Sequence, residues 1–91
     1  MVKLNAADNY KITSVNHLLG LRELNAYKNS GIDQNGIREL RQVVKLDASY
    51  NVKITSVNHL RELQALDAYD SGIDKSGISE LRQIVTLRGI Y

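Results

Sequence analysis

The sequence is a doubled unit. The octapeptide KITSVNHL occupies residues 11–18 and returns at residues 53–60, so each of its residues recurs at the corresponding place of a second copy. The likeness extends over residues 2–27 and 44–69, which align without a gap, and the later unit then loses one residue. Self-similarity of this kind is typical of chains in which equivalent segments stack on one another and share a core.

Each unit divides again into two shorter phrases. A leucine begins every phrase, and these leucines recur at nearly but not quite equal intervals: Leu4, Leu24, Leu46, Leu66 and Leu87. The whole chain, 1–91, is therefore expected to form one domain of four turns and a fifth strand. Its parts are the units 2–43 and 44–84, followed by residues 85–91.

The spacing of apolar residues changes within each phrase. Around the leucine, as in Leu24-x-Ala26, apolar residues alternate with a period of two, which indicates a strand. Later, as in residues 15–21 and 37–43, they recur every third residue, which favours a short helix or 3₁₀ segment with one buried stripe. Parallel strands need a crossover of about a dozen residues, and these phrases are long enough to supply one. The pattern predicts an α/β chain that alternates strand and helical return.

Two segments, LRELNAYKNSGI and VVKLDASYNVKI, resemble the leucine-rich repeat phrase Leu-x-x-Leu-x-Leu-x-x-Asn-x-x-Leu. Ala26 and Ala48 replace the third leucine, and Ile32 and Ile54 replace the last. The likeness covers essentially the whole chain and is closest to the short-repeat, internalin-like branch. It implies a right-handed solenoid with parallel strands on the concave face and short helices on the convex face. It also implies protein binding without catalysis.

The same resemblance places three asparagines in a structural ladder: Asn9, Asn29 and Asn51. Such a side chain is expected to be buried and to bond backbone groups of its own and the adjacent turn, because a buried amide must find partners. The fourth phrase is one residue short at this point, which leaves Asp70 or Ser71 to substitute.

Local signals also mark where the returns begin. Asp33 and Asn35 precede one return and Asp74 and Ser76 the other, in positions suited to capping a helical segment. Gly36 and the equivalent Gly77 are expected to permit a tight entry into these returns.

Catalytic and metal-binding chemistry is not indicated. His17 and His59 recur at equivalent positions, but two turns should separate them by roughly twice the ~4.8 Å strand spacing, too far for the ~2 Å bonds of one zinc ion. No phosphate-loop, nucleophile-elbow or zinc-protease phrase occurs. We therefore expect no enzyme activity, no cofactor and no metal, with the histidines solvated or acting as caps.

Composition bears on the partners. Twelve Lys and Arg are interspersed with ten Asp and Glu for a net charge of +2, so no phosphate-binding footprint stands out and nucleic acid is not expected. No apolar run approaches the ~18 residues of a membrane span. There is no cysteine, so no disulfide framework can form.

A protein partner would meet the strand residues that point away from the core. The candidates for this concave face are Asn25, Tyr27, Asp47, Asp67 and Tyr69. Tyrosine is a common interface anchor, and it also occurs in strands simply to pack on its neighbours. Both interpretations of the two tyrosines stay open at this point.

Self-association is the other expectation, because neither end of the sequence has a polar capping phrase. The residues expected to mediate it are Val2, Leu4, Leu87, Ile90 and Tyr91. Contact between copies could be head-to-tail or through a twofold axis. The undrifted octapeptide favours an engineered or excised repeat scaffold that associates with itself, and the alternative is a natural protein-recognition module.

Overall fold

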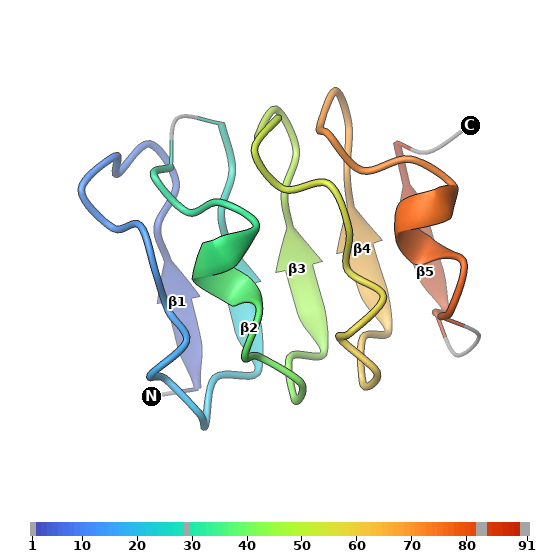
Figure 1. The fold of residues 1–91 in the computed structure, drawn as a ribbon, viewed down its shortest axis with the longest axis horizontal. Coiled ribbons are helices and arrows are strands. Elements are labelled where there is room, and N and C mark those ends of the chain that lie inside the picture. Colours follow the sequence, from blue (N-terminus) through green and yellow to red (C-terminus); the bar gives the residue numbers. More distant parts are fainter. Residues whose placement is uncertain (1, 29, 82–83, 90–91) are drawn as a thin grey trace.

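The computed structural model describes residues 2–28, 30–81 and 84–89, which form a parallel-strand solenoid of about four turns (Figure 1). Five short strands lie side by side in chain order: β1 (Lys3–Asn5), β2 (Glu23–Asn25), β3 (Lys45–Asp47), β4 (Ala65–Asp67) and β5 (Thr86–Arg88). We name the windings after their strands: turn 1 is 3–22, turn 2 is 23–44, turn 3 is 45–64 and turn 4 is 65–85. The strand β5 follows turn 4.

The phrase leucines form one row across the sheet, as the sequence predicted. Leu4 pairs with Leu24, Leu24 with Leu46, and each later leucine with the next, all in parallel register. The inner members of the row, Leu24, Leu46 and Leu66, are 1 to 4% exposed. The unequal lengths of the phrases are therefore absorbed outside the strands.

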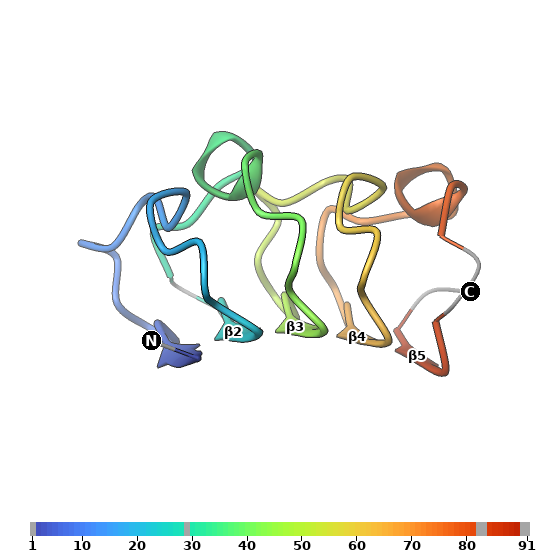
Figure 2. The same cartoon turned by 90° about the horizontal axis from the view of Figure 1, so that it is seen from below.

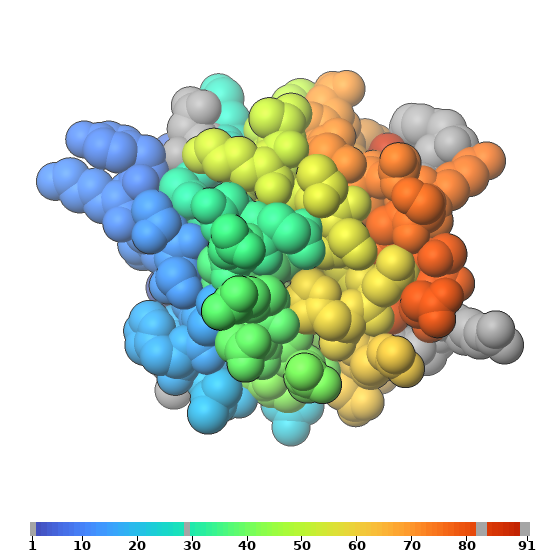
Figure 3. Space-filling model, in the orientation of Figure 1, coloured from blue at the N-terminus to red at the C-terminus, as the bar shows by residue number. Residues whose placement is uncertain are grey.

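The core lies between two layers, the strands on one side and the return segments on the other (Figure 2). The alanine two positions after each inner leucine is also buried, and Val, Ile and Leu of the returns close the core opposite. In the space-filling view of the return side, successive turns form adjacent bands (Figure 3). Each turn thus buries its apolar residues against its neighbours as well as within itself.

The return segments consist mostly of short hydrogen-bonded bends and not of helices. The expected α/β class with a helix in every winding is therefore not confirmed. Within the described residues, helix is limited to two 3₁₀ segments, η1 (Asn35–Ile37) and η2 (Ser76–Ile78). In turns 1 and 3, single backbone hydrogen bonds between residues three apart follow one another instead. For example, the N–H of Leu18 donates to the carbonyl of Val15, and the N–H of Leu21 donates to the carbonyl of Leu18. This bond pattern has the same period of three as the apolar residues, which explains the mistaken helix. No helix in the described part of the chain is long and apolar enough to cross a membrane.

A left-handed residue bends the chain after each of the first four strands. Asp8, Lys28, Tyr50 and Asp70 have φ between 48° and 62°, and each lies four positions after its row leucine. This conformation costs a non-glycine residue about 1 kcal/mol. The bend recurs at the same place in each winding whether the residue is aspartate, lysine or tyrosine, so it follows the repeat and not one residue type.

Each 3₁₀ segment is capped by the carboxylate of an aspartate that lies two residues before it. An Asp33 carboxylate oxygen accepts the N–H of Gly36 at 2.8 Å. The Asp74 carboxylate accepts the N–H of Gly77 at 3.0 Å and the hydroxyl of Ser76 at 2.7 Å. The predicted capping is thus carried by the two aspartates, and Ser76 supports one of them.

These bonds make turn 4 sensitive to acid. The Ser76 hydroxyl, followed by the Gly77 amide, holds the pKa of Asp74 below its ordinary value. Because the folded pKa is depressed, the cap contributes its stability above the ordinary carboxyl pKa, and that stability is lost as the pH falls through the folded value. An NMR titration should find the Asp74 carboxyl protonating at lower pH in the wild-type chain than in Ser76→Ala. Equal midpoints in the two proteins would contradict this prediction.

Candidate functional site

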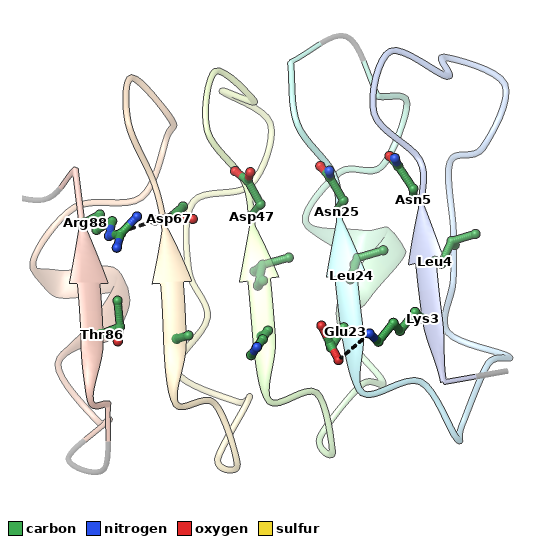
Figure 4. Close-up of a pocket in the computed structure, with 13 residues that line it drawn as sticks. Lys3, Leu4, Asn5, Glu23, Leu24, Asn25, Asp47, Asp67, Thr86 and Arg88 are labelled. Atoms are coloured by element: carbon green, nitrogen blue, oxygen red, sulfur yellow. Dashed lines mark ion pairs between the residues drawn. The ribbon is translucent and has the colours of Figure 1, made fainter.

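The strand face carries a groove of about 690 Å³ that crosses all five strands (Figure 4). Its lining includes three of the predicted concave-face residues, Asn25, Asp47 and Asp67. These three residues lie within strands and share the groove, and their role in binding stays a prediction.

Ion pairs occupy the two ends of the groove. The Lys3 ammonium lies 3.6 Å from the Glu23 carboxylate, and the Arg88 guanidinium lies 3.8 Å from that of Asp67. Both pairs are largely exposed, so they contribute little to stability. Between them, on β3, Lys45 has no carboxylate within 4.0 Å among the described residues. The middle of the groove thus presents a cation that a partner could pair.

Side chains at the ends of the strands are partly used by their own backbone. The Asn25 side-chain oxygen accepts the N–H of Tyr27, and an Asp47 oxygen accepts the N–H of Ser49, both at 3.0 Å. Each of these oxygens terminates its strand by satisfying an amide that the ladder leaves free. Two binding candidates therefore also have a structural task.

The two predicted tyrosines lie outside the groove lining. Tyr27 makes an edge-to-face contact with Tyr50, with ring centroids 5.6 Å apart and planes at 77°. Tyr69 is 41% exposed. Ser49, on the turn between them, is buried, and its hydroxyl accepts the Tyr69 N–H at 3.2 Å. Tyr27 is thus engaged in intramolecular packing.

The predicted ladder asparagines differ in their surroundings. Asn51 is 2% exposed and donates to the carbonyls of Ala26 and Ile32 in turn 2, at 3.0 Å each. Asn9 is exposed, and its side chain makes one hydrogen bond among the described residues, accepting the N–H of Lys11. Asn29 lies outside the described residues. The difference arises because the partners of Asn51 belong to the preceding turn, and no described turn precedes turn 1.

In the short fourth phrase a serine takes the asparagine position. The Ser71 hydroxyl donates to the carbonyl of Ala68 at 2.9 Å and accepts the N–H of Ile73 at 3.1 Å. Asp70, the other residue proposed for this task, is the left-handed residue of the bend. A shorter side chain thus fits a shorter bend.

Of the residues proposed for self-association, Leu4 lies in the outer strand β1, directly after Val2, and Leu87 lies in the outer strand β5. Val2 is 57% exposed and Leu87 is 42% exposed, whereas Leu4 is half-buried. Ile90 and Tyr91 lie outside the described residues. The outer members of the leucine row are thus more exposed than the inner ones.

The histidines occupy different environments. The ring Nε2–H of His59 donates to the carbonyl of Ile37 in turn 2 at 2.9 Å, while His17 is exposed. No group of three or more His, Asp or Glu side chains placed to hold a metal ion occurs among residues 2–28, 30–81 and 84–89.

Side-chain amides on the return side bridge consecutive turns, and sequence reasoning missed them. Asn16 donates to the carbonyl of Asn35 and accepts the N–H of Glu39, both at 2.8 Å. Asn58, its counterpart in turn 3, makes the equivalent bonds to turn 4. We call these bridges the amide clamps. The signal for them was the invariant Asn-His of the repeated octapeptide.

A glutamine clamps the remaining joint, from turn 2 to turn 3. The Gln34 amide donates to the carbonyl of Ser56 at 2.8 Å, and its oxygen accepts the N–H groups of Thr55 and Ser56 at 2.8 and 2.9 Å. Each of the three joints between turns is therefore bridged by a side-chain amide on the return side and by paired strands on the other side.

Removal of the Gln34 clamp should destabilise the chain measurably. Gln34→Ala deletes four hydrogen bonds, counting one from the Thr55 hydroxyl at 3.3 Å. The site is partly exposed and water can replace some of them, so we expect a loss of about 1 to 2 kcal/mol. Urea denaturation measures the loss. Gln42→Ala is a suitable comparison, because that amide makes one long bond across turns, at 3.4 Å. Equal losses in both variants would show that the clamp has no special role.

The sequence matches no known protein family, and comparisons with curated proteins and with solved structures found no match.

Proposed function

We propose that the chain is a non-enzymatic repeat scaffold that associates with further copies of itself, with turn 1 of one copy seated on turn 4 of another. The supporting observation is that turn 1 carries the same residue types with which turn 3 contacts turn 2. The internal joint then serves as a template for a joint between copies.

Three polar side chains of turn 3 donate to backbone carbonyls of turn 2. Besides Asn51 and His59, the Lys53 ammonium donates to the carbonyl of Ser30 at 3.2 Å. Their counterparts in turn 1 are identical residues and are exposed: Asn9, Lys11 and His17. Turn 1 therefore presents three donors for which a preceding turn would supply acceptors.

Two apolar residues of turn 1 are likewise more exposed than their counterparts in turn 3. Ile54 and Leu60 of turn 3 are buried, whereas the equivalent Ile12 and Leu18 of turn 1 are only half-buried. Covering the turn 1 face removes apolar surface from water, which favours association at about 25 cal/mol per Å².

Turn 4 is the counterpart of turn 2 and so offers the matching surface. The carbonyl of Ile73 stands in sequence where that of Ile32 accepts from Asn51. The carbonyl of Ala68, the counterpart of Ala26, already accepts the Ser71 hydroxyl, so an incoming Asn9 amide would share it. The strand β5 occupies the adjacent sheet position, so the joint requires β1 of the incoming copy to replace it. All three β5 residues are exposed, so displacing β5 uncovers little buried surface and the free-energy cost of the exchange is low.

One residue weakens the joint. Lys75 stands in turn 4 where Gln34 clamps turn 2 to turn 3. Lysine can donate but cannot accept, so the N–H groups of Thr13 and Ser14 in the incoming copy gain no partner from it. Lys75→Gln should restore the clamp and tighten association about tenfold, or ~1.4 kcal/mol.

Light scattering coupled to size exclusion tests the proposal. We expect concentration-dependent association of the wild-type chain, stronger association of Lys75→Gln, and weaker association of the exposed-face double variant Asn9→Ala/Lys11→Ala. Leu19→Arg is a matched control, because Leu19 is exposed and its turn 3 counterpart is Arg61. A wild-type chain and a Lys75→Gln variant that both stay monomeric would refute the proposal.

A second candidate function is protein recognition by the groove on the strand face. Lys45 at its centre has no carboxylate within 4.0 Å in the described part of the chain, and Asp47 and Asp67 lie beside it, which favours this candidate. Lys45→Ala should weaken a groove-bound partner, and Tyr27→Ser/Tyr69→Ser tests the role of the tyrosines. If a partner binds both variants as tightly as it binds the wild-type chain, its binding site lies outside the groove.

We also infer that the solenoid is of the leucine-rich type and right-handed. The leucine row, the buried Asn51 and the parallel strands support this inference, and right-handed crossovers are the rule between parallel strands. The undrifted octapeptide supports an engineered or excised origin.

A further inference from the structure

We propose that Asn35-Gly36 is a site of spontaneous deamidation. The native fold protects it, and it becomes reactive when turn 2 opens. It is the only Asn-Gly pair in the sequence. Glycine after asparagine leaves the backbone nitrogen unhindered, because it has no side chain. Asparagine at such positions is a thermolabile residue.

The reaction needs no partner other than water. The Gly36 nitrogen loses its proton and attacks the side-chain carbon Cγ of Asn35, forming a new C–N bond. The bond from Cγ to the amide nitrogen breaks, and ammonia leaves. Water then opens the cyclic imide at either carbonyl to give aspartate or isoaspartate, with no change of oxidation state.

The native geometry opposes the first step. The Gly36 N–H donates to both the carboxylate of Asp33 at 2.8 Å and its carbonyl at 3.0 Å, so the nucleophile is held as a hydrogen-bond donor. Asn35 lies in η1. A helical ψ directs the next nitrogen away from the side chain of the same residue. Gly36 is also buried against the carbonyl of Thr13.

These contacts of Gly36 are what opposes imide formation in the native chain. The Asn35 side chain is exposed and makes no hydrogen bond among those of the described residues, so it is free to rotate toward the nitrogen. Rotation of ψ at Asn35 and release of the Asp33 cap would suffice. Opening of turn 2 is therefore the event that sets the rate.

Modification would also loosen the joint between turns 1 and 2. The Asn35 carbonyl accepts the amide clamp of Asn16 at 2.8 Å. Isoaspartate lengthens the backbone by one methylene at this carbonyl, directly before the buried Gly36. The modified chain is expected to unfold at lower urea concentration than the intact one.

The duplication supplies an internal control. Turn 4 has Ser76-Gly77 with the same 3₁₀ segment and the same aspartate cap. Serine cannot form the imide. The cap of Asp74 can thus be removed without touching the reactive pair.

Peptide mapping by mass spectrometry tests the proposal at neutral pH, where Asn35 shows the mass change of an amide converted to an acid. We expect slow conversion in the native chain and conversion about fivefold faster or more in urea and in Asp33→Ala. Asp74→Ala should stay near the native rate, with folding of each variant checked by circular dichroism. A native rate equal to the rate in urea, or an Asp33→Ala rate no faster than that of Asp74→Ala, would overturn the proposal.

Discussion

Replacing Gly36 by alanine is expected to cost about 3 kcal/mol of folding free energy, because overpacking against a fixed neighbour costs roughly 1 to 3 kcal/mol or more. A Cβ atom built at Gly36 would lie 2.1 Å from the carbonyl oxygen of Thr13 in turn 1. The obstacle is backbone, so no side chain can rotate away, and turns 1 and 2 must separate. Because the backbone at Gly36 does not have a positive φ, close approach alone requires glycine here.

Gly20→Ala is the matched control. Gly20 is exposed, its φ is not positive, and its counterpart in turn 3 is Glu62, so a side chain is already accommodated at this position. The change should lie within about 0.5 kcal/mol of the wild-type stability. Urea denaturation of both variants gives the comparison. A Gly36→Ala chain as stable as Gly20→Ala would mean that turns 1 and 2 do not pack as described.

Asn51→Ala should be nearly as destabilising, by about 3 kcal/mol, since each buried polar group left unsatisfied costs about 1 to 3 kcal/mol. The Asn51 side chain is buried, and its removal leaves the carbonyls of Ala26 and Ile32 and the N–H of Lys53 without their partner. Some relaxation or water entry recovers part of the total, which keeps the expected loss below the full sum.

Asn9→Ala separates this effect from a general loss of asparagine. The residue has the same place in the repeat, yet it is exposed, and within the described part of the chain its side chain accepts one amide, of its own turn. Its loss should cost under about 1 kcal/mol in the monomer. Thermal or urea unfolding at low protein concentration measures both variants. Similar losses at Asn9 and Asn51 would contradict the assignment of the ladder to contacts between turns.

The strand register could be predicted from the sequence because one leucine marks each strand. Leu24 and Leu46 stand farther apart in the sequence than Leu46 and Leu66 do, yet all three align. A buried row tolerates no slip, since moving a strand by a single position exchanges its inner and outer faces. Differences in length are then left to the bends and returns, where Ser71 replaces an asparagine.

The form of the returns could not be predicted, because a period of three does not distinguish a helix from a chain of single turns. Val15 and Leu18 have the spacing of a buried helical stripe, but isolated i to i+3 bonds join them. The clamps of Asn16 and Gln34 were missed for a related reason. Their partners lie in another turn, so they follow from the stacking and not from local sequence.

The direction of side chains on the strand face could be predicted only as far as strand geometry extends. Asp47 and Asp67 lie in strands and face the groove, in keeping with alternation of side chains. Tyr27 comes directly before Lys28, where φ becomes positive and the chain leaves the strand. Alternation no longer fixes the direction of a side chain at that point, so Tyr27 packs on Tyr50 instead.

The most direct test of the stacked solenoid is an NMR measurement of through-space contacts between selectively labelled leucine methyl groups. If the turns stack as described, Leu24 gives contacts to Leu46 and Leu46 gives contacts to Leu66, although a full turn of the solenoid separates each pair along the chain. Absence of both contacts in a folded chain, with leucine contacts confined to positions three or four apart, would contradict the fold and every inference drawn from it.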